Sequence, residues 1–334
     1  MRKIAIIGAG SWGTALAIAL TRSSRPHRLS LWAHSADIVE LLRTKRVNEV
    51  YLPGFELPAE IAVTGSMGEA LAEAEIVLGV MPAAHARSVY RAMRQHLAAQ
   101  SVFVSATKGL EPATHARISE VISEELREKS PLRIAILSGP SFALEVAEGD
   151  PTVAVLASAD AALAAEVQEE FSGPRFRLYT NDDVIGTEIA GAVKNVIAIA
   201  AGTSMGLGLG TNTMAALVTR GLAEMTRLAV ALGGRRETLA GLAGVGDLIL
   251  TSTGALSRNR SVGVELGKGR ELGEILGATR MVAEGVGSAA ATLELARRAG
   301  IEMPITEQVH AVLTAGRATR NSIRDLMERR LKQE

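Results

Sequence analysis

Lys194 is the residue in this sequence best placed to do acid–base chemistry. It lies in an apolar stretch, residues 182–201, whose spacing of Ile, Val and Ala predicts one buried helix. Small residues such as Gly191 and Ala198 share its side of the helix and would let a ligand approach the ammonium group. Burial lowers the pKa of a lysine towards neutrality, which suits a proton donor and acceptor. The alternative is a structural lysine whose long side chain extends to the surface.

Two other stretches carry polar residues that predict a function. Asp247 is the single acid of an apolar, Gly-rich stretch, so its carboxylate needs a partner. We predict that this partner is Lys194. The alternative is that Asp247 serves as a helix N-cap. Ser257, Arg258 and Asn259 lie at a predicted helix start. A hydroxyl, a guanidinium and an amide on consecutive residues would bind a phosphate or a carboxylate. An exposed polar turn is the alternative at these three positions.

The N-terminus has the pattern of a dinucleotide-binding loop. An apolar strand at residues 3–7 leads into Gly8-Ala-Gly10-Ser-Trp-Gly13, and an Ala/Leu-rich helix follows. Gly8 allows a tight turn, Gly10 lets a pyrophosphate approach, and Gly13 lets helix and strand pack closely. The N–H groups at the helix start would face the phosphates. We therefore predict binding of NAD or NADP rather than a glycine-rich turn without a ligand.

The coenzyme preference depends on the end of the second predicted strand, residues 28–32. An NAD-selective site usually places an acid there, on the ribose 2′-hydroxyl. This strand runs instead into Ala33, His34 and Ser35, and the first acid is Asp37. Since no carboxylate is placed to repel a 2′-phosphate, we favour NADPH or the use of both coenzymes. His34 would contact the adenosine end or serve as a polar turn residue.

Strands and helices alternate through the first half of the chain, which predicts an α/β fold with a parallel, doubly wound sheet. Ligands bind such sheets beyond the carboxyl ends of the strands. Lys108 follows the fifth predicted strand, and the tight turn from Gly139 to Ser141 follows the sixth, so both would lie at the mouth of a site. The alternatives are an ordinary turn lysine and a tight turn that binds no ligand. The further strands are predicted at residues 61–64, 76–80, 102–105, 133–137, 152–157 and 176–180.

The second half of the chain has a helical pattern without strands. The lysine helix is followed by a predicted Gly-rich connector at residues 202–210 and a long helix at 213–232. We place the boundary between the domains where the strands stop. This gives a dinucleotide-binding domain at residues 1–181 and an all-helical substrate-binding and catalytic domain at residues 182–334.

Composition excludes several classes of protein. The 334 residues suggest two domains, and 36 basic against 36 acidic residues argue against a nucleic-acid partner. The absence of cysteine excludes disulfides and Cys-based metal sites, and we predict no metal. We find neither a signal peptide nor an apolar run of the roughly 18 residues that a membrane span needs. We expect a soluble, cytoplasmic protein.

Together these motifs resemble the bacterial-type NAD(P)-dependent glycerol-3-phosphate dehydrogenase family. The lysine–asparagine helix combined with Ser-Arg-Asn-Arg is the most specific feature. The resemblance implies a Rossmann domain followed by an all-helical domain, with the site between them. The matching segments occur in family order and cover nearly the whole chain, at residues 8–13, 106–110, 138–142, 191–196, 219–225, 246–247 and 257–260.

The resemblance also implies roles at matching positions, with Lys194 as the catalytic proton donor and acceptor. The residues that would line the glycerol phosphate site are Lys108, Gly139, Ser141, Lys194, Asp247, Ser257, Arg258 and Asn259. The residues that would contact the coenzyme are Gly8, Gly10, Ser11, Trp12, Gly13, His34, Lys108, Ala143, Arg258, Val282 and Glu284. The family further implies a homodimer that reversibly reduces dihydroxyacetone phosphate and supplies glycerophospholipid synthesis.

Two other functions are compatible with parts of the pattern. One is a related dehydrogenase, with the same domains and lysine, that acts on a 3-hydroxy acid or a sugar-acid phosphate, because Ser-Arg-Asn-Arg at residues 257–260 would serve either anion. The other is a dinucleotide-sensing binding protein, which would need the glycine loop but not the lysine, the acid and the anion-binding residues together. A substrate panel tests the first alternative, and turnover tests the second.

Overall fold

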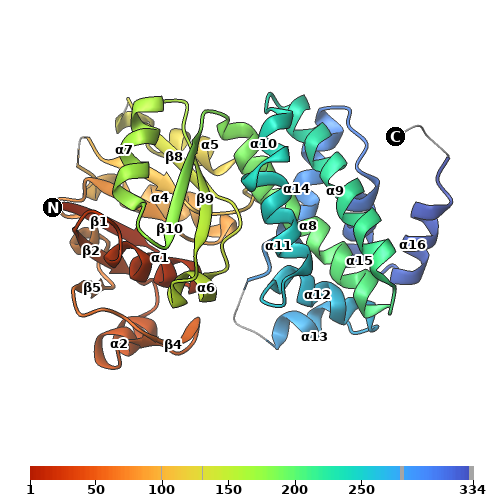
Figure 1. Cartoon of the computed structure of the whole chain (residues 1–334), viewed down its shortest axis with the longest axis horizontal. Helices are drawn as coiled ribbons and strands as arrows, with labels where there is room; N and C mark the ends of the chain where they lie inside the picture. The colour runs from red at the N-terminus through yellow and green to blue at the C-terminus, as the bar shows by residue number, and fades with distance from the viewer. Residues whose placement is uncertain (99, 130, 279–281, 331–334) are drawn as a thin grey trace.

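The computed structural model describes residues 1–98, 100–129, 131–278 and 282–330 of the chain. An eight-stranded sheet covered by helices forms the first half, and a group of helices packed on one another forms the second (Figure 1). The predicted fold class is therefore confirmed. We place the domain boundary between residues 181 and 182; residues 331–334 of the second predicted domain lie outside the described part.

The sheet has the strand order β10-β9-β8-β7-β6-β1-β2-β5. The strands from β5 to β8 are parallel and follow the doubly wound order. In register, Ile7 pairs with Trp32 and Gly79, and Gly79 pairs with Ser105, so the segments that follow these strands start at one edge. The strands are β1 Arg2–Ile7, β2 His27–Trp32, β5 Ile61–Thr64, β6 Ile76–Gly79, β7 Val102–Ser105, β8 Arg133–Ser138, β9 Thr152–Ala157 and β10 Phe176–Asn181.

The sheet departs from the predicted parallel arrangement at one end. β9 pairs antiparallel with β8 and parallel with β10. The connection between β8 and β9 contains only the short helix α6, Ala143–Glu148, which packs on α1, Ser11–Thr21. Because this connection does not cross the sheet, β9 begins at the edge where β8 ends and must run in the opposite direction.

Alternate side chains of β1 belong to two separate hydrophobic cores. Ile4 and Ile6 belong to the core on one face of the sheet, whereas Ala5 and Ile7 belong to the core on the other. Such strands are buried on both sides, which is the usual condition of a parallel sheet. Helices α1, α2 (Ala36–Thr44) and α7 (Ala161–Phe171) contribute to the first core, and α3 (Met67–Leu71), α4 (Ala83–Met93) and α5 (Ile118–Glu125) to the second.

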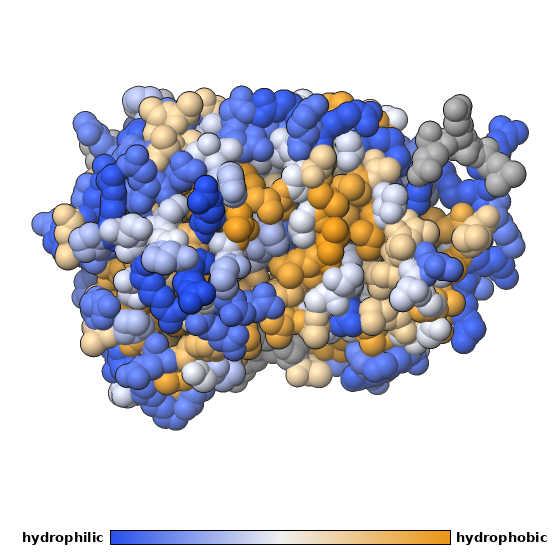
Figure 2. Space-filling view, viewed as in Figure 1, coloured by the Kyte–Doolittle hydropathy of each residue, from blue (hydrophilic) through white to orange (hydrophobic). Residues whose placement is uncertain are grey.

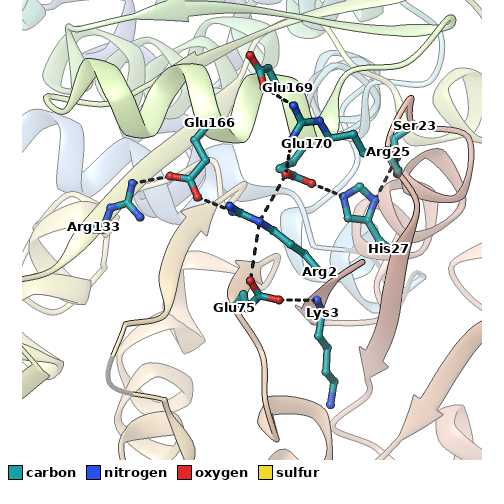
Figure 3. A network of polar contacts seen from close by, with 10 residues as sticks. All are labelled: Arg2, Lys3, Ser23, Arg25, His27, Glu75, Arg133, Glu166, Glu169 and Glu170. Atoms are coloured by element: carbon teal, nitrogen blue, oxygen red, sulfur yellow. Dashed lines mark hydrogen bonds and ion pairs between the residues drawn. The ribbon is translucent and has the colours of Figure 1, made fainter.

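A network of charged side chains joins α7 to the amino ends of β1 and β2 (Figure 3). The buried carboxylate of Glu170 accepts hydrogen bonds from Arg25 at 3.0 Å and His27 at 2.9 Å, and it lies 3.5 Å from the guanidinium of Arg2. Arg2 also pairs with Glu166 of α7. Since ligands bind at the opposite, carboxyl ends of the strands, we interpret this network as structural.

A short hairpin was not predicted. Strands β3, Val47–Asn48, and β4, Leu52–Glu56, pair antiparallel between α2 and β5 and lie beside α1. Pro53 and Gly54 fall within β4, and both residue types are rare in strands, so the segment carries no strand-like pattern.

Helix α8, Val184–Gly206, forms the centre of the helical domain. It is longer than predicted, so the expected connector is wrong for residues 202–206. A Cβ at Gly202 would lie 2.0 Å from the carbonyl oxygen of Arg260, and one at Gly206 would lie 2.2 Å from that of Val264. These glycines therefore belong to the last turns of the helix, where they let α12, Arg258–Gly267, pack closely against it.

The other helices of this domain pack around α8 or continue the bundle. The prediction that no apolar run reaches the length of a membrane span is wrong for α8, the one helix in the described residues that is long and apolar enough. However, 83% of its apolar window is buried inside the protein, as expected for a core helix. The remaining elements are α9 Thr211–Ala231, α10 Arg236–Ala240, the π-helical turn η3 Leu242–Gly246, α11 Asp247–Thr253, α13 Leu272–Gly277, α14 Glu284–Arg298, α15 Pro304–Ala315 and α16 Thr319–Met327.

Candidate active site

Two lysines from different domains share the carboxylate of Asp247. Lys194 of α8 is 4% exposed; its Nζ forms an ion pair with Oδ1 of Asp247 and donates to Oγ1 of Thr251 at 3.0 Å. Nζ of Lys108 donates to the other carboxylate oxygen, Oδ2, at 3.0 Å. The expected pairing of Asp247 with Lys194 is therefore present, and Lys194 does not extend to the surface. We call Lys108, Lys194, Asp247 and Thr251 the lysine cluster.

Lys108 connects this cluster to the carboxyl edge of the sheet. Besides Asp247, its Nζ donates to the carbonyl oxygen of Gly139 at 2.8 Å and to Oγ of Ser141 at 3.2 Å. Gly139 has a φ of +111°, which a residue with a side chain rarely adopts. Because β7 and β8 are neighbours, the turns after them meet, and three predicted residues from two motifs come together.

Burial and charge set the protonation of the lysine cluster. Burial lowers the pKa of Lys194 to about 7; the nearby charge of Lys108 also lowers it, while Asp247 opposes the shift. Burial alone would raise the pKa of Asp247, but the ammonium groups of Lys108 and Lys194 hold that pKa below its ordinary value. Asp247 is thus an anion at neutral pH, and Lys194 can exchange a proton close to pH 7.

Ser257 and Asn259 lie at the start of α12, as predicted. Oγ of Ser257 accepts a hydrogen bond from the backbone N–H of Arg260 at 3.2 Å and so caps the helix. Nδ2 of Asn259 donates to Oδ1 of Asn195, the neighbour of Lys194, at 2.9 Å. Oδ1 of Asn259 accepts from the backbone N–H of Gly285, also at 2.9 Å. An amide chain therefore links the residue beside Lys194 to the segment containing Val282 and Glu284.

Arg258 reaches from the helical domain to the glycine loop. Its Nη2 donates to Oγ of Ser11 at 3.0 Å, and its Nη1 donates to the carbonyl oxygen of Val282 at 3.2 Å. Glu284 accepts from the backbone N–H of Ala83 at 3.3 Å, and burial raises its pKa to about 7. These contacts bring four predicted residues to the junction of the two domains.

The glycine loop fits the pyrophosphate of a dinucleotide. Gly8 has a φ of +122°, and a Cβ there would lie 2.0 Å from the carbonyl oxygen of Val80. A Cβ at Gly13 would lie 1.8 Å from the carbonyl oxygen of Gly8, whereas no atom of the described part of the chain lies within 4 Å of one at Gly10. Among the described residues, no side chain caps the N-terminus of α1, where Gly10 is the N-cap residue. The loop thus leaves backbone N–H groups and space for an anion at its middle glycine.

Three predicted coenzyme contacts lie apart from the lysine cluster. Trp12 and Ala143 are half-buried against the core of the nucleotide domain, and Nε1 of Trp12 has no hydrogen-bond partner within the described residues. His34 is exposed after β2, with its ring centroid 5.8 Å from that of Trp32. β2 and β7 are three strand positions apart, roughly 14 Å at the usual spacing, so a ligand contacting both His34 and Lys108 must be extended.

Some groups at the site were not predicted from sequence. Thr251 follows Asp247 by one helical turn, and this i, i+4 spacing on an apolar helix was an available signal. The backbone N–H groups of Gly285 and Ala83 gave no sequence signal, because every residue except proline carries one.

Comparison with known proteins decides the family. Residues 3–164 match the N-terminal domain of NAD-dependent glycerol-3-phosphate dehydrogenase, and residues 183–324 match the C-terminal domain. The chain belongs to the NAD-dependent glycerol-3-phosphate dehydrogenase family. The resemblance inferred from the motifs is thereby confirmed.

Individual members of the glycerol-3-phosphate dehydrogenase family are similar along nearly the whole chain. A protein of Koribacter versatilis named glycerol-3-phosphate dehydrogenase (NAD(P)+) is 55% identical over 330 residues, 98% of each chain. One of the same name from Acidobacterium capsulatum is 54% identical over 334 residues, again 98% of each. The solved glycerol-3-phosphate dehydrogenase of Coxiella burnetii is 40% identical with a TM-score of 0.93, and the match covers 98% of this chain and 99% of that one.

Proposed function

We propose that this protein is an NAD(P)-dependent oxidoreductase acting on a CH–OH group, and that it reversibly reduces dihydroxyacetone phosphate to sn-glycerol 3-phosphate. The names of its relatives support the reaction and the use of NAD or NADP. The single observation that carries the proposal in the structure is the buried Lys194, held by Asp247 beside Lys108 where the two domains meet.

Lys194 is the residue we assign to proton transfer. Reduction of a ketone places negative charge on its oxygen, which must receive a proton. The ammonium of Lys194 would donate that proton, and in the reverse reaction the neutral amine would accept it. Asp247 and Thr251 hold the Nζ of Lys194 in place, while Lys108 adds positive charge to the same site. A bound reduced nicotinamide would supply the hydride.

Arg258 is the residue we assign to the substrate phosphate, together with Ser257 and Asn259. A guanidinium has five N–H donors, and within the described residues Arg258 donates hydrogen bonds to Ser11 and Val282, which leaves donors for a ligand. Its side chain reaches from the start of α12 to the glycine loop, so it would contact both the coenzyme and the substrate. Phosphate binding away from the reacting carbon would orient the ketone without taking part in the chemistry. Gly139 and Ser141, beside Lys108, complete the proposed substrate site.

The coenzyme would be held by the glycine loop, with Trp12, His34, Ala143 and Glu284 as further contacts. The end of β2 supports our preference for NADPH, because His34 is exposed there and Asp37 accepts a hydrogen bond from the Ser35 hydroxyl. A carboxylate aimed at the ribose is the feature that would instead select NAD.

The first experiment follows the loss of reduced-nicotinamide absorbance with dihydroxyacetone phosphate, using NADPH and NADH in parallel. We expect rapid oxidation, and the ratio of the two kcat/KM values gives the coenzyme preference. Dihydroxyacetone without its phosphate is the matched control and should react far more slowly. Binding of either coenzyme without oxidation would contradict the proposal; a panel of 2-oxo and 3-oxo acids would then test a dehydrogenase for carboxylate substrates.

The rate should depend on pH in opposite ways in the two directions. Because the pKa of Lys194 is about 7, its ammonium predominates below pH 7 and its amine above. We expect kcat/KM for ketone reduction to be level below pH 7 and to fall about tenfold per unit above it. For alcohol oxidation, kcat/KM should rise to pH 7 and then level off. Initial rates from pH 5.5 to 9 test this; profiles with no common break near pH 7 would contradict the assignment.

We also propose that the protein is a cytoplasmic homodimer whose product enters glycerophospholipid synthesis. Apolar areas lie on the visible face of the helical domain (Figure 2), and the exposed apolar side chains of that domain include Val230 of α9, Ile249 of α11 and Leu256. Exposed apolar side chains of this kind support contact with a second copy. Light scattering during size-exclusion chromatography tests the dimer, and a monomer mass at micromolar concentration would contradict it.

A further inference from the structure

Asn48 is a buried amide that contacts the glycine loop directly. It is 0% exposed and lies at the end of β3, in the hairpin that was not predicted. Its Nδ2 donates to the carbonyl oxygen of Ala9 at 2.9 Å and to Oγ1 of Thr14 at 2.8 Å. Its Oδ1 accepts from the backbone N–H of Tyr51 at 3.2 Å. The orientation of the amide is unambiguous, because the carbonyl of Ala9 can only accept and the N–H of Tyr51 can only donate.

The contact to Ala9 sets the direction of an N–H group in the loop. The carbonyl of Ala9 and the N–H of Gly10 belong to one planar trans peptide, so they point in opposite directions. Asn48 binds the carbonyl from one side, and this turns the N–H of Gly10 to the other. Thr14 lies in the first turn of α1 and donates its N–H to the carbonyl of Gly10, so Asn48 also joins the loop to the start of the helix.

A second contact connects the same hairpin to the loop. Oγ of Ser11 donates to the carbonyl oxygen of Tyr51 at 2.5 Å and accepts from Arg258, the residue that we assign to the substrate phosphate. The turn from Asn48 to Tyr51 therefore binds the glycine loop on both sides of Gly10. Neither contact is needed for the hairpin to pair with itself, since β3 and β4 pair through their backbones.

We propose that Asn48 is a positioning residue for the coenzyme, which holds the glycine loop in the shape that receives the pyrophosphate. This inference rests on the proposed function, because it takes the bound dinucleotide as its ligand. Asn48 acts through Ala9 and Thr14 rather than by touching the coenzyme. Its removal should therefore weaken coenzyme binding and leave the proton transfer at Lys194 intact.

The test compares Asn48→Ala with the wild-type enzyme by calorimetric titration with NADPH and by steady-state kinetics. Loss of two buried hydrogen bonds should raise the Kd and KM for NADPH about 10- to 100-fold. At saturating NADPH, kcat and the KM for dihydroxyacetone phosphate should stay within about threefold. If Asn48 had a purely structural role, Asn48→Ala would lower the melting temperature without raising the KM for NADPH selectively over any change in kcat.

Three further variants sharpen the result. Asn48→Asp keeps the acceptor for Tyr51 but loses both donors, so it should resemble Asn48→Ala; recovery of the wild-type Kd in this variant would contradict the role of the donors. Glu49→Gln is the matched control, because Glu49 is exposed in the same hairpin and pairs with Lys45. Thr14→Val removes one hydrogen-bond acceptor of Asn48 with little change in side-chain shape. It provides the test of the inference if Asn48→Ala does not fold. We expect it to raise the Kd about 3- to 10-fold.

A Kd for NADPH within twofold of wild type in Asn48→Ala, or in Thr14→Val where Asn48→Ala does not fold, would overturn the inference. The wild-type measurements separate this result from failure of the proposed function. Wild-type enzyme that binds NADPH but does not oxidise it with dihydroxyacetone phosphate would contradict the proposed reaction and leave the role of Asn48 to be judged on Kd alone.

Discussion

Replacing Lys194 with alanine should reduce kcat for dihydroxyacetone phosphate reduction by about 10³-fold or more, within the upper range known for loss of a general acid. The Kd for NADPH should change by less than about threefold, because Lys194 lies in the helical domain and contacts Asp247 and Thr251 rather than the glycine loop. The variant loses the proton donor, while Lys108 still pairs with the carboxylate of Asp247.

The measurement for Lys194→Ala combines single-turnover oxidation of NADPH with a separate binding titration. Lys45→Ala is the matched control, because Lys45 is an exposed lysine paired with Glu49 and should not affect either value. Near-normal turnover of Lys194→Ala would refute the assignment of proton transfer. If Lys194→Ala lost NADPH binding as well as turnover, we would conclude that the substitution disrupts the folding of α8. The same measurements would then be made on Lys194→Met.

Asp247→Asn should have the second largest effect, a fall of about 10²-fold in kcat for ketone reduction at pH 7, within the range known for impaired general acid catalysis. The substitution leaves Lys108 and Lys194 close together without the carboxylate between them. Because the charge of Asp247 raises the pKa of Lys194, its loss must move that pKa below 7. At pH 7, Lys194 would then be mostly neutral and a poor donor.

The diagnostic feature of Asp247→Asn is its pH profile. Ketone reduction should recover partly as the pH falls, whereas alcohol oxidation, which uses the neutral amine, should keep its rate to lower pH than in wild type. Asp182→Asn is the control, since Asp182 is an exposed aspartate paired with Arg235. If the break in the Asp247→Asn profile stays near pH 7, Asp247 does not set the protonation of Lys194.

The fold was predictable where a local pattern follows from the backbone itself. The loop from Gly8 to Gly13 needs positive φ and close approach at fixed positions, so the sequence alone showed a strand, a turn and a helix there. The direction of β9 was not predictable, because it depends on whether a short connection crosses the sheet. The glycines at the end of α8 led to the wrong prediction of a connector for a similar reason. They are present because α12 packs closely against them, which is a tertiary contact.

The sequence by itself determined which chemistry was available: a lysine in an apolar helix, one acid in a Gly-rich stretch, an anion-binding Ser-Arg-Asn and a dinucleotide loop. Only the tertiary structure decided which of these groups meet. Lys108 and Asp247 are 139 residues apart in sequence, and Arg258 and Ser11 are 247 apart, yet both pairs form hydrogen bonds. Asn48 gave no signal at all, because an amide next to a turn looks like any other polar turn residue until the hairpin places it against Ala9. Helical and strand periodicity arise between near neighbours, whereas the pKa of Lys194 and the shape of the glycine loop arise from contacts that exist only after the chain has folded.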